Sequence, residues 1–283
     1  MTQIKICGVP EHFNFPWLQC IDESLFLNEN LNVQWTNVPE GTGKMCELLR
    51  QNNTDIAIVL TEGIVKDIVQ GNDSKIVQLF VESPLTWGIH VGAASKHSTI
   101  LDLEHKKVAI SRFGSGSHLM ACVHAKLLGW NPNKLDFVVV NNLQGAIDAL
   151  SQGDADYFLW EKLMTKPLVD SNVFRLVGEI PTPWPCFVIV VRSEFLEKNL
   201  EAVKKILEII NRKTTVFKSI NTIEQQIAAK YNLKTKDVNR WLSTVSWSQK
   251  PFTAKMLSKV QNELLALHLV DKKLTFAEVT ATL

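Results

Sequence analysis

The sequence lacks any hydrophobic run of the roughly 20 residues that a membrane-spanning helix requires. It also lacks an excess of charge, because 30 Lys and Arg residues balance 29 Asp and Glu residues to a net charge of +1. Such a chain offers no electrostatic reason to bind nucleic acid or an anionic membrane surface. We therefore expect no nucleic-acid partner and no membrane insertion.

The five cysteines are scattered and form no C-x-x-C pair. An odd, scattered set argues against a disulfide framework and favours reduced thiols in a cytoplasm. The first residues, Met1 to Gly8, show neither the charged region nor the apolar region of a secretory signal. The sequence therefore predicts a cytoplasmic protein, or a periplasmic one if a signal has been removed.

Motifs of cofactor and catalytic sites are absent or incomplete. In Gly41-Thr42-Gly43-Lys44 the lysine is followed by Met45, so the segment is not a nucleotide-binding P-loop. Gly114-x-Gly116 is followed by Leu119 where a dinucleotide fingerprint has its third glycine. The sequence contains no H-E-x-x-H zinc motif and no G-x-S-x-G nucleophile elbow. We therefore predict no cofactor, no metal ion and no catalytic residue.

Short apolar runs alternate with amphipathic stretches over most of the chain. The runs predict strands at residues 5–9, 31–38, 55–60, 76–81, 107–110, 137–140, 157–160 and 187–191. Polar loops such as 61–63 and helices such as 161–169 are expected between them, with further helices after Ser193. This alternation predicts an α/β fold of doubly wound parallel sheets, with ligands at the carboxyl ends of the strands.

The pattern is interrupted twice, near residues 84–92 and 185–192, which predicts two extended crossovers between two lobes. A faint repeat supports two lobes of similar build: Leu49, Gln51 and Asp55 recur 101 residues later as Leu150, Gln152 and Asp156. We expect lobe 1 to comprise residues 1–88 and 192–283, with the C-terminal helices packed on it. Residues 89–191 form lobe 2, and a ligand cleft lies between the lobes.

The strongest candidate site is Ser115-Gly116-Ser117-His118, between the strand at 107–110 and a helix. Its backbone N–H groups, hydroxyls and helix dipole can bind an anionic or polar group. The same loop can instead be a plain turn in which Ser117 caps the helix. Trp160 and Glu161 lie at another strand end, where the tryptophan either stacks on a ligand ring or is buried in the sheet.

Lobe 1 offers polar side chains at comparable strand ends: His12, Asn14, Thr42, Thr61 and Glu62. Glu62 either accepts a hydrogen bond from a ligand amine or hydroxyl, or is a first-turn glutamate that only interacts favourably with the helix dipole. Trp87, in a crossover, is either a ligand contact or a core anchor. Eight tryptophans suggest a ligand with an aromatic part, and two carboxylates beside an anion-binding loop suggest a zwitterionic one with an anionic group.

Six segments carry a resemblance to a known family: 10–14, 41–45, 60–63, 83–90, 114–118 and 158–162. They resemble substrate-binding proteins of ABC transporters with the type II periplasmic-binding-protein fold, in the branch of sulfonate, nitrate and thiamine-pyrimidine binders. Within it they are similar to a bacterial and fungal subset without secretion signals. The resemblance covers about residues 3–192. It implies two α/β lobes, a two-strand hinge and a small-molecule ligand between the lobes.

The function that the resemblance implies is binding without catalysis. The lobes would close around a small molecule for sensing, sequestration or delivery in the cytoplasm. An enzyme of thiamine-pyrimidine-type metabolism on the same fold is the first alternative, although this sequence lacks the cysteine cluster of the fungal pyrimidine-precursor synthases. An extracytoplasmic ABC transporter component is the second. The protein partner stays open.

Overall fold

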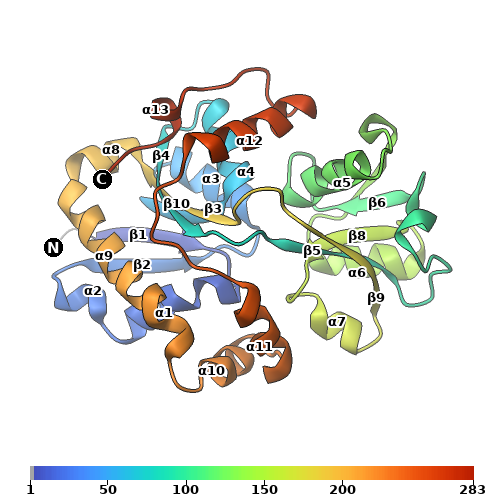
Figure 1. Cartoon of the computed structure of the whole chain (residues 1–283), viewed down its shortest axis with the longest axis horizontal. Helices are drawn as coiled ribbons and strands as arrows, with labels where there is room; N and C mark the ends of the chain where they lie inside the picture. The colour runs from blue at the N-terminus through green and yellow to red at the C-terminus, as the bar shows by residue number, and fades with distance from the viewer. Residues whose placement is uncertain (1–2) are drawn as a thin grey trace. The chain divides into compact units, whose positions relative to one another are not determined.

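The computed structural model describes residues 3–283, which form two compact units (Figure 1). Unit 1 contains the chain up to Ser83 and again from Trp184 onward, whereas unit 2 runs from Pro84 to Pro183. Each unit has one five-stranded sheet with helices packed against it. The predicted α/β class with two separate lobes is therefore confirmed.

The sheet of unit 1 has the strand order β2-β1-β3-β10-β4. Its strands are β1 (Gln3–Gly8), β2 (Asn32–Asn37), β3 (Ile56–Leu60), β4 (Ser74–Val81) and β10 (Phe187–Arg192). Strands β2, β1 and β3 are parallel, while β10 runs antiparallel to both of its neighbours. The residues of β3 are apolar on both faces and nearly all buried, as expected for a central strand covered on both sides.

Unit 1 takes its helices from both ends of the chain. The N-terminal ones are the 3-10 helix η1 (His12–Asn14), α1 (Phe15–Asp22), α2 (Leu25–Asn28), α3 (Thr42–Arg50) and α4 (Thr61–Val69). The C-terminal ones are α8 (Ser193–Lys198), α9 (Leu200–Val216), η4 (Phe217–Ser219), α10 (Ile223–Tyr231), α11 (Thr235–Thr244), α12 (Ala254–Ala266) and α13 (Phe276–Val279). Because α9 packs on α1, α12 on α4 and α13 on β4, the C-terminal helices belong to unit 1, as predicted.

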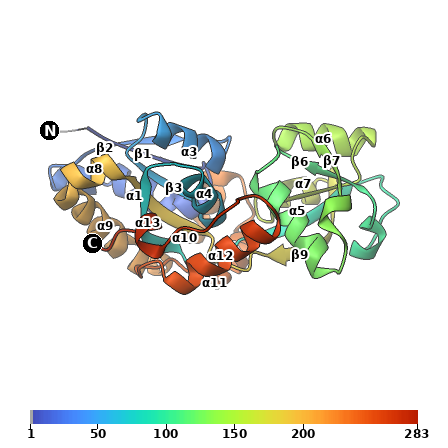
Figure 2. The ribbon, with the colours of Figure 1, turned by 90° about the horizontal axis from the view of Figure 1, so that it is seen from above.

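Unit 2 has the strand order β7-β6-β8-β5-β9. Its strands are β5 (Thr86–Gly92), β6 (Lys107–Ile110), β7 (Asp136–Val139), β8 (Tyr157–Glu161) and β9 (Phe174–Pro181). Its helices are α5 (Gly116–Leu127), α6 (Leu143–Gln152) and α7 (Lys166–Asp170), with the 3-10 helices η2 (Ile100–Leu103) and η3 (Pro132–Lys134). Figure 2 shows α5 and α6 on opposite faces of this sheet.

The two sheets are built to one plan. In each, three parallel strands are followed by one antiparallel strand, which is β10 in unit 1 and β5 in unit 2. Each antiparallel strand enters from the other unit, because β5 follows β4 and β10 follows β9 along the chain. The prediction of purely parallel sheets is therefore wrong for one strand in each sheet, since these strands are not reached by a helical crossover.

The two connections between the units lie beside each other. Within unit 1, Cys186 N–H donates to the carbonyl of Ser83 (3.2 Å), and within unit 2, Thr182 N–H donates to the carbonyl of Leu85 (2.9 Å). The division falls after Ser83 and after Pro183, not at the predicted residues 88 and 191. The reason is that β5 lies wholly in the sheet of unit 2 and β10 wholly in that of unit 1.

Three local predictions were wrong. Strand β9 was not predicted, because Gly178 interrupts its apolar pattern and Pro181 ends it. The helix expected over 161–169 is only the short α7, since Glu161 is still in β8 and a turn follows. The loop expected at 61–63 is the first turn of α4, so Thr61 and Glu62 are helical.

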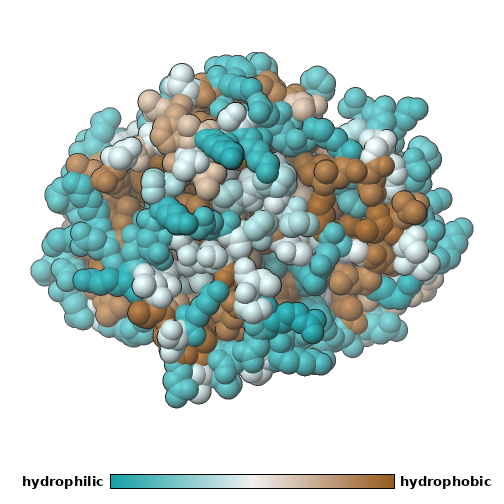
Figure 3. All heavy atoms as spheres, in the orientation of Figure 1, coloured by the Kyte–Doolittle hydropathy of each residue, from teal (hydrophilic) through white to brown (hydrophobic). Residues whose placement is uncertain are grey.

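Within residues 3–283, no helix combines the length and the hydrophobicity needed to cross a bilayer. All five cysteines are buried and free of disulfides. On the face shown in Figure 3, hydrophobic side chains gather most densely over unit 2.

Candidate functional site

In unit 1, a short 3-10 turn after β1 places His12 and Asn14 in the interior. Their side chains are buried, at 0% and 1% exposure. Asn14 donates from Nδ2 to the carbonyl of Val9 (2.9 Å), but its Oδ1 has no partner within the described residues. Neither ring nitrogen of His12 has one, and the ring packs edge-on against Trp241 at 4.3 Å. Burial lowers the pKa of His12 to about 3, so the imidazole is neutral at pH 7.

Thr61 and Glu62 form the first turn of α4, at the end of β3. The hydroxyl of Thr61 donates to the carbonyl of Pro185 (2.7 Å), which ties α4 to the connection that leads into β10. Glu62 Oε2 accepts a hydrogen bond from the indole N–H of Trp184 (2.7 Å), whereas Oε1 has no partner among residues 3–283. Burial raises the pKa of Glu62 to about 7, although hydrogen bonding with its own backbone N–H and with Trp184 lowers it.

Thr42 begins α3, directly after Gly41, whose φ of +81° suits glycine. The Oγ1 atom of Thr42 accepts a hydrogen bond from the backbone N–H of Leu60 (3.2 Å). This contact holds the start of α3 against the end of β3. Gly63 of α4 lies so close that a Cβ there would be 2.5 Å from Cγ2 of Thr42.

These residues of unit 1 share one edge of its sheet. Strands β1 and β3 are parallel neighbours, so their carboxyl ends lie side by side. The ring of Phe13 in η1 lies 5.2 Å from that of Phe187, which pairs with Leu60 at the end of β3. The five predicted residues of unit 1 therefore come from three segments that meet at this edge.

In unit 2, the Gly/Ser loop forms a compact cluster of hydroxyls at the start of α5. Ser115 is the N-cap of α5, and its Oγ accepts a hydrogen bond from His118 N–H (3.3 Å). The alternative in which Ser117 caps the helix is therefore wrong. Ser117 Oγ instead accepts from the backbone N–H of Ser111 (3.0 Å) and contacts the hydroxyls of Ser111 (3.3 Å) and Ser115 (3.0 Å).

Some hydrogen-bond donors of this cluster are not used within the protein. Three hydroxyl groups carry three protons, and the two contacts between Oγ atoms use two of them. The backbone N–H groups of Gly116 and Ser117 have no acceptor among the hydrogen bonds of the described residues. One hydroxyl proton and two N–H groups at the positive end of a 12-residue helix suit a single anionic group.

Trp87, Trp160 and Glu161 meet at one place in the sheet of unit 2, because Trp87 pairs with Glu161 across β5 and β8. The ring of Trp160 is half-buried, stacks on Phe158 at 5.2 Å and meets Trp87 edge-on at 6.5 Å. Glu161 Oε2 accepts from Met164 N–H (2.6 Å), and burial raises the pKa of this carboxyl to about 7. Trp87 is 5% exposed, and its indole N–H has no partner in the described chain.

Sequence reasoning left two features of this region out. It did not pair Glu62 with Trp184, because the residues are 122 positions apart. It also passed over the rings of Phe113 and Phe137, which contact His118 at 5.3 and 4.8 Å. The apolar character of these two phenylalanines could have suggested only burial.

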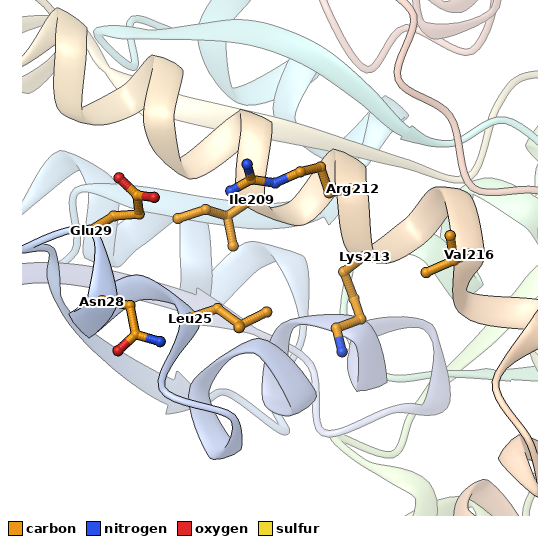
Figure 4. Close-up of a pocket in the computed structure, with 7 residues that line it drawn as sticks. All are labelled: Leu25, Asn28, Glu29, Ile209, Arg212, Lys213 and Val216. Carbon is orange, nitrogen blue, oxygen red and sulfur yellow. The ribbon is translucent and has the colours of Figure 1, made fainter.

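A groove of about 390 Å³ lies elsewhere in unit 1 (Figure 4). It is lined by Leu25, Asn28, Glu29, Ile209, Arg212, Lys213 and Val216. None of the predicted site residues lines it. Over residues 3–283, no three His, Cys, Asp or Glu side chains gather where they could hold a metal ion.

A family model described as "Ca3427-like PBP" matches residues 87–180, which lie in unit 2 and include its predicted site residues. Among curated proteins, none matches the sequence. The solved structure of the Candida albicans CA3427 gene product, described as having the generic periplasmic binding protein fold, is 25% identical. It covers 96% of this chain and 92% of its own, with a TM-score of 0.88.

Two more solved structures are similar in fold. The alkanesulfonate-binding protein SsuA from Xanthomonas axonopodis pv. citri, bound to MOPS, is 16% identical and has a TM-score of 0.85 over 100% of this chain and 99% of its own. PhnD1 from Prochlorococcus marinus, in complex with methylphosphonate, is 12% identical. Its TM-score is 0.62 over 95% of this chain and 99% of its own.

Proposed function

Because this chain has the periplasmic-binding-protein-like fold, we propose that it binds one small organic ligand with an anionic group and leaves it chemically unchanged. The residues proposed to contact the ligand are the strand-end residues of the two units. In unit 2 they are Ser115, Gly116, Ser117 and His118, with Trp160, Glu161 and Trp87. In unit 1 they are His12, Asn14, Thr42, Thr61 and Glu62.

One observation carries this proposal: four of the twelve buried polar atoms without partners in the described chain belong to three predicted residues of unit 1. They are both ring nitrogens of His12, Oδ1 of Asn14 and Oε1 of Glu62. Buried polar atoms in folded proteins are nearly always paired, so several orphans at one sheet edge suggest a missing partner. A ligand amine or hydroxyl would supply donors to the oxygens, and a neutral imidazole offers one donor and one acceptor.

The anionic group is supported by unit 2. Two backbone N–H groups and a spare hydroxyl proton at the start of α5 are all donors. The related structures bind ligands of this chemistry, since one is an alkanesulfonate-binding protein and another holds methylphosphonate. The donors of unit 2 suit an oxyanion, and the acceptors of unit 1 suit a hydrogen-bond donor, so a ligand that carries both groups is favoured.

The test uses a charge placed at the start of α5. The helix dipole stabilises an aspartate in the first turn of a helix, so Gly116→Asp should fold normally. The added negative charge should nevertheless repel an anionic ligand. Gln144→Asp is the matched control, because Gln144 is exposed in the first turn of α6. Thermal shifts would be measured with alkanesulfonates, methylphosphonate, aromatic zwitterions and pyrimidines, beside native mass spectrometry for a retained ligand.

We expect an oxyanion to stabilise the protein and the Gln144→Asp variant, and Gly116→Asp to lose that stabilisation. If no compound of the panel stabilises the protein and no ligand is retained, the proposal is wrong. If an oxyanion stabilised Gly116→Asp as much as the unmodified protein, the start of α5 would not be part of the binding site.

A second function is favoured by one observation. Glu62 and Glu161 both have pKa values of about 7, which suits general acid–base catalysis near neutral pH. Enzymatic turnover of the ligand is therefore the competing proposal. Mass spectrometry of the bound compound after prolonged incubation separates the two, because binding returns it unchanged and catalysis returns a product.

A further inference from the structure

Exposed hydrophobic side chains are concentrated in unit 2. Of the ten large ones at the surface of the described chain, six lie between Pro84 and Pro183, which is about a third of the sequence. Five of the six are aliphatic, and the sixth is Phe113, which is 64% exposed. Single exposed hydrophobic side chains are ordinary in folded proteins, but Phe113 lies immediately before the Gly/Ser loop that begins α5.

Phe113 is not a loose surface residue, because two other rings hold it. Its ring centroid lies 5.3 Å from that of His118 and 5.7 Å from that of Phe137, with interplanar angles of 70° and 75°. His118 and Phe137 contact each other at 4.8 Å, so each of the three rings touches the other two. We call Phe113, His118 and Phe137 the aromatic trio.

The backbone of the anion-binding loop fixes the trio. Gly114 N–H donates to Nδ1 of His118 (3.1 Å), which orients the imidazole and makes Nδ1 an acceptor. His118 itself is in the first turn of α5, and Phe113 comes three residues before Gly116. The donors proposed for the ligand's anionic group and two rings of the aromatic trio, those of Phe113 and His118, therefore belong to one continuous segment, 111–118.

We infer that the aromatic trio is a subsite for a planar ring carried next to the anionic group, so that the ligand is an aryl or heteroaryl oxyanion and not a small alkyl one. This inference rests on the proposed function. Edge-to-face and stacked ring contacts favour an aromatic occupant over an aliphatic one of equal charge. The exposed ring of Phe113 is then the part of the trio that a ligand covers.

The test compares matched pairs of probes that differ only in the ring: benzenesulfonate with methanesulfonate, phenylphosphonate with methylphosphonate, and benzoate with acetate. Binding would be measured by calorimetry for the unmodified protein, for Phe113→Ala and for Leu127→Ala. Leu127 is the control, because it is 69% exposed at the opposite end of α5. Both side chains are exposed, so neither substitution should unfold the protein.

In at least one pair, we expect the aryl probe to bind more tightly than the alkyl one. Phe113→Ala should weaken the aryl probe about two- to tenfold, the range that one ring contact contributes, and leave the alkyl probe unchanged. Leu127→Ala should change neither. Equal binding within every pair, or an equal loss of both probes in Phe113→Ala, would overturn the subsite while leaving the proposed function intact. No binding in any pair would overturn the subsite, and together with no stabilisation by the wider panel and no retained ligand it would contradict the proposed function as well.

Discussion

Asp55 and Asp156 occupy the same position in the two sheets. Asp55 immediately precedes β3, and its Oδ2 accepts a hydrogen bond from the backbone N–H of Lys5 in β1 (2.9 Å). Asp156 immediately precedes β8, and its Oδ2 accepts from the backbone N–H of Lys107 in β6 (2.9 Å). The faint repeat of 101 residues in the sequence is therefore a structural one, in which a carboxylate joins two neighbouring parallel strands of each sheet, β1 and β3 in unit 1 and β6 and β8 in unit 2.

The second oxygen of each carboxylate faces a basic side chain, but the two surroundings differ. Asp55 Oδ1 accepts from Nη2 of Arg192 at 3.1 Å, and both side chains are largely buried. Asp156 Oδ1 lies 3.5 Å from Nε2 of His97, with its carboxylate side chain one-third exposed. The attraction between Asp55 and Arg192 is therefore stronger than that between Asp156 and His97, because the first pair is closer and less screened by solvent.

Replacing either aspartate with asparagine keeps an acceptor for the strand N–H but removes the charge. We expect Asp55→Asn to lower the free energy of unfolding by about 2 kcal/mol, because the largely buried Arg192 then keeps only the exposed Glu194 as its anionic partner. Asp156→Asn should lower it by about 1 kcal/mol or less. Urea denaturation measures both, and amide exchange at Lys5 and Lys107 locates each effect. A larger loss for Asp156→Asn would contradict this assignment.

The buried carboxyl of Glu62 should make stability depend on pH. Its pKa is raised to about 7 from an ordinary value of 4.5, so the folded protein keeps a proton that the unfolded chain has lost between these pH values. Glu62 therefore stabilises the fold below about pH 4.5, and this contribution, about 3 kcal/mol, is lost as pH rises toward 7.

Glu62→Gln tests this dependence, because glutamine keeps an oxygen acceptor for the Trp184 indole and does not titrate. The difference in unfolding free energy between the two proteins is measured by urea denaturation at pH 5 and pH 8. The variant should gain relative stability at pH 8. Taking the difference cancels His12, whose lowered pKa acts in the opposite direction. A pH-independent difference would show that Glu62 is ionised in the folded protein at both pH values.

Gly63 and Thr42 should behave as a coupled pair. Gly63→Ala would place a Cβ 2.5 Å from Cγ2 of Thr42 and displace a side chain whose hydroxyl bonds Leu60 N–H. We expect a loss of about 1–3 kcal/mol of stability. Thr42→Ser keeps the hydroxyl and lacks Cγ2, so the double variant should recover most of that loss. A double-mutant cycle by urea denaturation measures the coupling, and strict additivity would contradict the contact.

Ser117→Ala should weaken both the fold of unit 2 and its ligand site. The substitution leaves the buried N–H of Ser111 without its acceptor, at a cost of about 1–3 kcal/mol, and disconnects the hydroxyls of Ser111 and Ser115. Ser151→Ala is the control, because Ser151 is exposed in α6 of the same unit. Thermal denaturation and oxyanion titration follow the two effects. Unchanged stability would mean that water replaces the lost hydroxyl.

Local pattern was enough to find most strands and the existence of α5. The strand at 107–110 was predicted to the residue, because a short apolar run bounded by polar and glycine-rich segments is typical of a buried strand. Local pattern was not enough to predict whether a strand runs parallel or antiparallel to its neighbours. The apolar runs of β5 and β10 suit either orientation, and their antiparallel pairing depends on where the connection between units enters each sheet.

The sequence by itself determined the α/β class, the two lobes and the polar strand ends, because these follow from hydrophobic periodicity and turn chemistry within a few residues. Only the tertiary structure decided what those polar groups bond to. It assigned Ser115 and not Ser117 as the cap of α5, and it paired Glu62 with Trp184. The cap depends on which serine the loop turns toward the N–H of His118, and the Glu62–Trp184 pair depends on a contact between segments 122 residues apart. Neither can be read from residue spacing.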